Sequence, residues 1–386
     1  MKKVLVIGGG VAGTEAVITL RKYGFTVELL SDRPYFYAYP AAIWVPTGEV
    51  KPEAVKLGLE DFCKRWGASF RQGKLERIEE DKAVLDDGTA LSFDYAVLAL
   101  GQGKLPVKGL EHTLSPCGTP EEIERIKDEL DELIKKGTGR IAFGFAGNPK
   151  DKSAMRGGPL FELLFNVDDL LRRRGLRERF ELFFFSPSPS PGERLGKKAV
   201  ELLQKTFKKL GIKSKTGVKI KEFTPEGVVF EDGETVKTDL TLFIPGGKGL
   251  PVLERSGLPL NEAGFVKIDD RCRVEGSGTL YAVGDCAAVE GPPWVAKQGH
   301  LSESMARIAA RDLAYREGLT PKPPESYKKH LHIICLMDMG RRGAGLAYRD
   351  DRRALFIPLP VVGHWIKRLW LPYYKAVKTG RLPRII

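Results

Sequence analysis

The stretch KVLVIGGGVAG, residues 3–13, decides the fold. It opens with an apolar run that predicts a short buried strand, and its glycines keep the spacing GxGxxG at Gly8, Gly10 and Gly13. The first glycine of such a unit permits a tight turn, the second lets a pyrophosphate approach the backbone, and the third lets helix pack on strand. A helical pattern over residues 12–23 and an apolar strand over residues 25–30 follow. The sequence therefore predicts a dinucleotide-binding βαβ unit.

The second strand of this unit ends in Ser31 and Asp32. An acidic residue about 20 positions beyond the glycines commonly binds the ribose of a dinucleotide. We therefore expect Ser31 and Asp32 to contact ribose, and the alternative is that they only form a turn. Glu28 lies within the strand and is expected to point elsewhere.

Length and composition indicate a globular protein of two or three domains. The chain has 386 residues, and its 62 Lys and Arg against 50 Asp and Glu give a net charge of +12. This charge fits an anionic partner or a well-solvated surface equally well. No stretch reaches the roughly 18 apolar residues of a spanning helix, and we expect no signal peptide. The five cysteines lack metal-ligand spacing, which argues against zinc and a disulfide scaffold and fits a reducing compartment.

A hairpin followed by a buried strand occurs twice along the chain. Asp-Gly hairpins at residues 84–89 and 228–233 are each followed by a buried strand that ends in glycine, at 95–101 and 240–246. This duplication predicts two nucleotide-fold halves. Between them the sequence predicts helices over 120–136, 159–174 and 196–210 and strands over 140–145 and 181–185.

The second half does not repeat the glycine cradle. The strand at 140–145 runs into GFAGNPKD, residues 144–151, and no helix begins before Pro159. The sequence therefore argues against an NAD(P)H site. A later strand, residues 279–285, ends in Gly284 and Asp285, and such a carboxylate either reaches a polyol hydroxyl of a cofactor or caps the next turn.

Several segments resemble those of the sulfide:quinone oxidoreductases and the flavocytochrome-type sulfide dehydrogenases, within the two-dinucleotide-domain flavoproteins that include type II NADH dehydrogenases. The matching segments are LSDRPYF at 30–36 with Pro40 and Trp44, FELLFN at 161–166, LRRRGLR at 171–177, Gly284-Asp285, KQGH at 297–300 and CLMDMG at 335–340. The resemblance covers nearly the whole chain. It implies an α/β fold with two Rossmann-like dinucleotide-binding domains, the glutathione-reductase-like FAD/NAD(P) fold, plus a C-terminal amphipathic helical region.

The resemblance also implies domain boundaries and a cofactor. The FAD-binding domain would comprise 1–110 and 249–320, the second Rossmann-like domain 111–248, and a quinone- and membrane-interaction region 321–386. The implied FAD-binding residues are Gly8, Gly10, Val11, Ala12, Gly13, Ser31, Asp32, Pro40, Leu75, Ala99, Gly101, Gly284, Asp285, Lys297 and Gly299. A cation at Lys297 near the flavin N1–C2 edge would stabilise the anionic reduced flavin, and the alternative is a surface lysine.

The chain departs from this family at a redox cysteine. The family uses two cysteines beside the flavin; Cys335 matches one, but Arg156 stands where the other is expected. Cys117, just before the helix at 120–136, is a substitute partner, because a helix N-terminus favours the thiolate. The alternative is two unpaired cysteines. Arg156 would bind an anion, and the alternative is a structural arginine. The catalytic candidates are therefore Cys335, Cys117, Lys297 and Arg156. We expect no metal site.

The C-terminal tail, residues 361–386, carries aromatic and aliphatic residues at helical spacing, namely Trp365, Ile366, Leu369, Trp370, Tyr373, Tyr374 and Val377. The cations expected on its remaining faces are Lys367, Arg368, Lys375, Lys378, Arg381 and Arg384. Pro372 is expected to begin a second short helix and Gly380 to end it. A basic amphipathic pair of helices predicts an in-plane membrane anchor that uses the positive charge on anionic lipids. The alternative is docking on the protein's own core or in a dimer.

These features favour a peripheral-membrane FAD oxidoreductase at the cytoplasmic side, which passes electrons from sulfide or a related small sulfur donor to quinone. The expected partners are that donor, quinone and the membrane surface, with a homo-oligomer as an open option and no nucleic acid. One alternative is a type II NADH:quinone oxidoreductase. Another is an electron-transfer flavoprotein subunit without sulfide activity.

Overall fold

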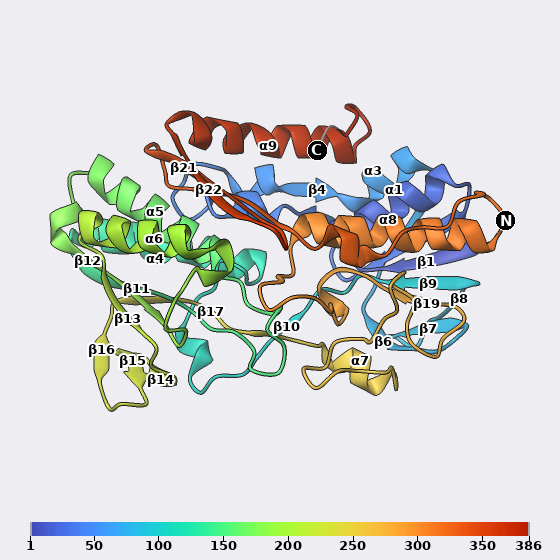
Figure 1. Ribbon diagram of the computed structural model, residues 1–386, viewed down its shortest axis with the longest axis horizontal. Helices are drawn as coiled ribbons and strands as arrows, with labels where there is room; N and C mark the ends of the chain where they lie inside the picture. Colours follow the sequence, from blue (N-terminus) through green and yellow to red (C-terminus); the bar gives the residue numbers. More distant parts are fainter. Residues whose placement is uncertain (1, 385–386) are drawn as a thin grey trace.

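The computed structural model describes residues 2–384 and contains two parallel sheets that lie side by side (Figure 1). The first sheet has the order β19-β9-β1-β2-β5, with β19 (Leu280–Ala282), β9 (Tyr95–Leu98), β1 (Lys3–Ile7), β2 (Thr26–Ser31) and β5 (Ser69–Gln72). Each pair of neighbouring strands in this sheet is parallel. The chain thus leaves this sheet after β9 and returns to it at β19. The predicted βαβ unit is confirmed, with α1 (Val11–Lys22) as its helix.

The second sheet has the order β13-β12-β11-β17 and is also parallel, with β13 (Lys213–Thr216), β12 (Phe180–Ser186), β11 (Gly139–Phe145) and β17 (Leu240–Ile244). Successive side chains of a strand point to opposite faces. Phe184 accordingly packs with α4 (Pro120–Lys136), α5 (Gly158–Arg173) and α6 (Lys197–Leu210). Phe183 and Phe185 pack on the other face, against β14 (Ile220–Thr224) and β15 (Gly227–Phe230).

Antiparallel hairpins and short elements complete both halves. The first half carries β3 (Tyr35–Tyr37), α2 (Tyr39–Ala42), η1 (Pro52–Val55), β4 (Lys56–Gly58), α3 (Leu59–Trp66), β6 (Leu75–Ile78), β7 (Lys82–Leu85), β8 (Ala90–Ser92), α7 (Pro251–Arg255), η5 (Gly284–Cys286), α8 (Gly299–Arg316) and η6 (Tyr327–His330). The second half adds η2 (Leu110–His112), η3 (Arg177–Arg179), η4 (Glu193–Leu195) and β16 (Thr235–Lys237). A two-stranded ribbon of β10 (Gly103–Lys104) and β18 (Gly247–Lys248) joins the halves where the chain crosses between them.

The C-terminal part forms an antiparallel sheet of β20 (Ile333–Asp338), β21 (Gly343–Arg349) and β22 (Ala354–Pro360), followed by α9 (Val362–Lys378). Figure 1 shows α9 lying across the top of the molecule. No helix within residues 2–384 has the length and apolar character needed to cross a membrane.

The tail forms one helix, so the expectation of a break at Pro372 is wrong. Proline inside a helix removes one backbone hydrogen bond and is costly. The helix continues because buried ion pairs hold it on both sides of the proline, from Lys367 to Glu162 and from Lys378 to Glu15. The inner side chains Leu371 and Tyr374 also join the apolar core of the first half.

The sequence led us to expect that the tail cations form an outward basic face. The structure contradicts this expectation. Lys367 and Lys378 are 8% and 0% exposed, and among the six tail cations only Arg381 is fully exposed. The outward face is apolar instead, with Val362, Trp365, Ile366 and Leu369 between 49% and 67% exposed. The cations turn inward because buried carboxylates pair with them.

Candidate functional site

The five parallel strands of the first sheet end at one edge, and the glycine motif lies there. Gly8 follows β1 with a φ of +116°, and a side chain on it would overlap the Ala99 carbonyl oxygen. A side chain on Gly13 would overlap the Gly8 carbonyl oxygen. By contrast, a Cβ on Gly10 would meet nothing within 4 Å, so open space lies in front of α1. The roles predicted for the three glycines fit this geometry.

Two helix N-termini converge on that open space. The first turn of α1 has no side-chain cap and no acidic residue, and α8 begins at Gly299, whose Cβ position lies 3.9 Å from Val11 Cγ1. Helix N-termini offer free N–H groups and positive dipole ends to phosphate. Gly284 closes the edge, with its Cβ position 3.1 Å from the Ala12 Cβ. These residues fit the pyrophosphate of FAD.

The remaining predicted cofactor residues are placed as follows. Ser31 is buried at the end of β2, and Asp32 is exposed beside Arg33, whereas Glu28 pairs with Lys3 and Arg71, away from the edge as expected. Ala99 and Gly101 follow β9 at the edge. Pro40 is exposed within α2, and Leu75 is buried in the core from β6.

Lys297 is a buried cation rather than a surface lysine. It is 6% exposed, its Nζ donates to the carbonyls of Asp285 and Ala287, and it lies 3.8 Å from the centre of the Phe265 ring. Burial lowers the pKa of Lys297 to about 8. Its position fixes the loop that carries Asp285.

Arg156 joins the two groups that the sequence analysis considered separately. Its guanidinium forms an ion pair with the Asp285 carboxylate, and its charge acts on the Cys117 thiol. Burial raises the pKa of the Cys117 thiol, and Arg156 opposes that rise. Cys117 precedes α4, which Thr119 caps through the Glu122 N–H and Pro120 opens, as predicted.

Cys335 is the second thiol of the site and lies on β20. Its Sγ is 4.0 Å from the Cβ position of Gly158, at the start of α5. Burial, with the Glu162 carboxylate, raises the pKa of Cys335 to about 12. The Glu162 charge also raises the pKa of the Cys117 thiol. Both are free thiols, as are Cys63, Cys272 and Cys286, which are buried.

Sequence reasoning missed the residues around Glu162. Lys367 forms a buried ion pair with Glu162, and burial raises the pKa of Glu162 to about 7 while Lys367 opposes it. The Asp338 carboxylate accepts hydrogen bonds from Trp44 and His364, each at 2.8 Å. Trp44, Glu162 and Asp338 lie within the segments that carried the resemblance, but nothing in their spacing shows that they meet.

At the second sheet, the loop after β11 covers the carboxyl edge. Asn148 Nδ2 donates to the Gly247 carbonyl at 2.7 Å, and Arg194 reaches the Lys152 carbonyl. The first helix after β11 starts only at Gly158. The second sheet therefore lacks a helix that opens directly after β11, as the glycine cradle of a dinucleotide site would require.

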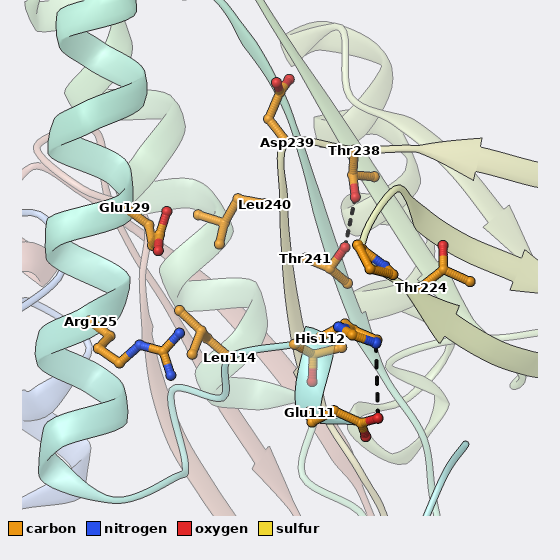
Figure 2. Close-up of a pocket in the computed structure, with 12 residues that line it drawn as sticks. Glu111, His112, Leu114, Arg125, Glu129, Thr224, Thr238, Asp239, Leu240 and Thr241 are labelled. Carbon is orange, nitrogen blue, oxygen red and sulfur yellow. Dashed lines mark hydrogen bonds and ion pairs between the residues drawn. The ribbon is translucent and has the colours of Figure 1, made fainter. Parts of the chain in front are cut away.

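A polar pocket elsewhere in the second half does not belong to this site. Figure 2 shows it beside Leu240 at the amino end of β17, between α4 and the β14–β16 hairpins. Thr238 and Thr241 hydrogen-bond each other there at 2.8 Å, and Glu111 lies 3.9 Å from His112. Within residues 2–384 no cluster of His, Cys, Asp and Glu could hold a metal ion.

Comparisons with known proteins identify relatives of the chain. The family model described as pyridine nucleotide-disulphide oxidoreductase matches residues 2–318. The chain is 26% identical to the sulfide-quinone reductase of Aquifex aeolicus over 99% of this chain and 92% of the relative. It is 24% identical to the demethylphylloquinone reductase NdbB of Synechocystis, over 74% and 72% of the two chains. The solved structure of the Aquifex aeolicus sulfide:quinone oxidoreductase superposes with a TM-score of 0.87 at 24% identity, covering 98% and 92%.

Proposed function

The chain belongs to the pyridine nucleotide-disulphide oxidoreductase family, and on that premise we propose that it passes electrons from sulfide or a related small sulfur donor to quinone. It is an FAD-dependent oxidoreductase. When bound, FAD supplies two-electron chemistry between donor and acceptor. The edge from Gly8 to Gly13 would hold its pyrophosphate, and Asp285 its ribityl chain. Lys297 holds the Asp285 loop through two carbonyls.

The observation that carries the proposal is the surrounding of the segment from Arg156 to Gly158. Cys117 and Cys335 come from distant segments, yet Cys335 Sγ lies 4.0 Å from the Cβ position of Gly158 and the Arg156 charge acts on the Cys117 thiol. Cys335 stands at the position of one family cysteine, and the relative at 26% identity is a sulfide-quinone reductase. We propose that these thiols form the redox pair in place of the cysteine that Arg156 replaces.

Arg156 would serve an anionic donor in this scheme. Its side chain is 30% exposed and touches both Cys117 and Asp285. A guanidinium binds anions through several N–H groups at once. Arg156 would thus orient hydrosulfide or another sulfur anion beside Cys117.

The apolar face of α9 would lie in the membrane on the cytoplasmic side and admit quinone. Trp365, Ile366 and Leu369 are exposed on it, next to the exposed Leu355 and Ile357 of β22. Exposed apolar clusters of this kind mark interaction surfaces. The competing occupant of this face is a second copy of the chain, and vesicle flotation with sedimentation of the lipid-free protein separates the two.

Anaerobic mixing of the purified holoprotein with sulfide or NADH tests the proposal. Sulfide should bleach the flavin, and quinone should restore its colour. Bleaching by NADH would support a type II NADH:quinone oxidoreductase, although no helix opens directly after β11 to form a second glycine cradle. If neither sulfide nor NADH bleaches the flavin, the result would support the third alternative, an electron-transfer flavoprotein subunit without sulfide activity.

Cysteine variants test the thiol pair. Replacing Cys335 by Ala should abolish flavin reduction by sulfide, and Cys117→Ala should reduce it strongly. Cys63→Ala, at a buried thiol away from the site, is the matched control and should retain activity. Unchanged reduction in Cys335→Ala would contradict the thiol mechanism.

A further inference from the structure

Two buried carboxylates lie behind the N-termini of α1 and α8. Glu15 is the fifth residue of α1 and Glu303 the fifth residue of α8, and they are 4% and 8% exposed. Each therefore lies about 6 Å along its helix from the first residue, with a side chain that leans toward the N-terminus. The two helices start side by side, because the Cβ position of Gly299 is 3.9 Å from Val11 Cγ1. Both carboxylates thus lie just behind the edge that would hold the pyrophosphate of FAD.

Negative charge in this place opposes binding of the cofactor. A helix N-terminus attracts phosphate through its free N–H groups and its positive dipole end. A carboxylate in the second turn offsets that field, and the pyrophosphate is itself negatively charged. Two like charges on neighbouring helices also repel each other, since burial leaves them weakly screened. Glu15 and Glu303 alone would therefore weaken the site that the glycines build.

The C-terminal tail supplies the opposing charge. Lys378 is 0% exposed, and its Nζ lies 2.9 Å from Glu15 Oε2 and 2.9 Å from Glu303 Oε1. Arg384 bridges the same two carboxylates, at 2.7 Å and 3.1 Å. Arg307 of α8 adds a third cation, 3.1 Å from Glu15. Among the described residues, three cations thus meet two carboxylates, and one positive charge remains in excess.

Fixing α9 in place does not require this cluster. Leu371 and Tyr374 already pack in the apolar core of the first half. Burying an ion pair costs about as much as the attraction returns, so further apolar residues would hold the helix equally well. The two carboxylates instead occupy the same step of two helices that open toward the cofactor. We propose that Lys378 and Arg384 are positioning residues for FAD, because they keep the field behind its pyrophosphate positive.

The effect is electrostatic and reaches the cofactor. The pyrophosphate would lie roughly 10 Å from the cluster, which is the rise of the first helical residues plus one hydrogen bond. At that distance in a partly buried setting, one unit of charge changes the affinity for the doubly charged pyrophosphate about tenfold. Loss of one tail cation cancels the excess positive charge, and loss of both makes the cluster negative. This role rests on the pyrophosphate position proposed above and is independent of the electron donor and acceptor.

Ultrafiltration of serially diluted holoprotein tests the role, because free FAD in the filtrate gives the dissociation constant of FAD. Lys378→Met should raise that constant about tenfold, and Lys378→Met with Arg384→Met should raise it further. Lys378→Met with Glu303→Gln restores the single excess positive charge, although it removes still more contacts of α9. Its dissociation constant should return near the wild-type value, while its melting temperature stays low.

Glu303→Gln alone separates the electrostatic role from a structural one. It increases the excess positive charge and should lower the dissociation constant of FAD, whereas a structural role predicts a rise. Arg381→Met, at an exposed cation of the same tail, is the matched control and should leave the constant unchanged. An unchanged constant in Lys378→Met, or no recovery when Glu303→Gln is added to it, would overturn the electrostatic role.

A variant of the glycine motif tests the position of the pyrophosphate. Gly10→Asp places a negative charge in the open space in front of α1, where a Cβ meets nothing within 4 Å. It should raise the dissociation constant of FAD, and an unchanged constant would overturn both that position and the role of the tail. Failure of sulfide to bleach the flavin, with all these constants as expected, would overturn the proposed donor and leave the role of the tail intact.

Discussion

Arg156 lies between two groups of opposite character, the Cys117 thiol and the Asp285 carboxylate. Its charge favours the thiolate of Cys117, and it also satisfies the carboxylate that would meet the cofactor. The family cysteine expected at this position could do neither of these things. Arg156 therefore adds a positive charge to the electrostatics of the site.

Loss of that charge should make Cys117 less reactive. In Arg156→Gln the pKa of Cys117 rises, because burial is then unopposed by the guanidinium. A rise of about one unit would slow alkylation at pH 8 roughly tenfold. Mass spectrometry after timed iodoacetamide treatment measures this rate. Arg156→Lys keeps a cation and should stay near the wild-type rate, and equal rates in all three proteins would show that Arg156 does not act on the thiol.

Lys297 controls the loop that carries Asp285. Lys297→Met leaves the carbonyls of Asp285 and Ala287 without this buried donor, at a cost of about 1–3 kcal/mol for each unsatisfied group. We expect lower flavin occupancy after gel filtration and a lower melting temperature, which added FAD restores in part. Lys267→Met, at an exposed lysine, should keep full occupancy. Full occupancy in Lys297→Met as well would mean that the loop does not depend on this cation.

At the scale of elements, the sequence predicted a helix or strand correctly where its structure depends on residues that are close together in the sequence. The spacing of Gly8, Gly10 and Gly13 predicted the βαβ unit, and Thr119 and Pro120 predicted the start of α4. The orientation of α9 could not be predicted in this way. Lys367 and Lys378 look like solvated cations in sequence, and only the distant carboxylates Glu162 and Glu15 turn them inward.

The same limit explains which site residues were missed. Asp338 and His364 are 26 positions apart, and Trp44 meets Asp338 across 294 positions. No periodicity connects such residues, because their meeting depends on how β20 and α9 pack. Cys117 and Cys335 were identified from the sequence only because a family resemblance singled them out.

The outward face of α9 leads to a prediction about lipids. Because most of the tail cations are paired or turned inward, binding to vesicles should depend on apolar contact and change little between neutral and anionic lipids. Trp365→Ser with Leu369→Ser should weaken partition into neutral vesicles at least about tenfold, since each side chain contributes roughly 1.5–3 kcal/mol when buried. Arg381→Ser, at an exposed cation of the tail, should bind nearly as the wild type. Binding only to anionic vesicles, lost in high salt, would contradict this view.

At the scale of the whole molecule, α9 ties the two halves together. Lys367 pairs with Glu162 of α5, in the second half. Eleven positions later, Lys378 pairs with Glu15 of α1 and Glu303 of α8, in the first half, each at 2.9 Å. The helices α1 and α8 begin where the pyrophosphate would lie. The helix that presents the apolar face is therefore fixed to both the thiol site and the cofactor edge.

Lys378→Met should loosen this connection at one end only. Removing one partner of a buried ion pair leaves an uncompensated charge and lowers the free energy of unfolding by about 3–5 kcal/mol. Arg384 also pairs with Glu15 and Glu303, so we expect a loss near the lower value. We expect a lower melting temperature by calorimetry and faster proteolysis after α8, because the released end of α9 no longer packs on α1. Arg381→Met removes an exposed cation three positions later and should change neither measurement. An unchanged melting temperature in Lys378→Met would mean that Leu371 and Tyr374, through their apolar contacts, hold α9 on the first half without the ion pairs.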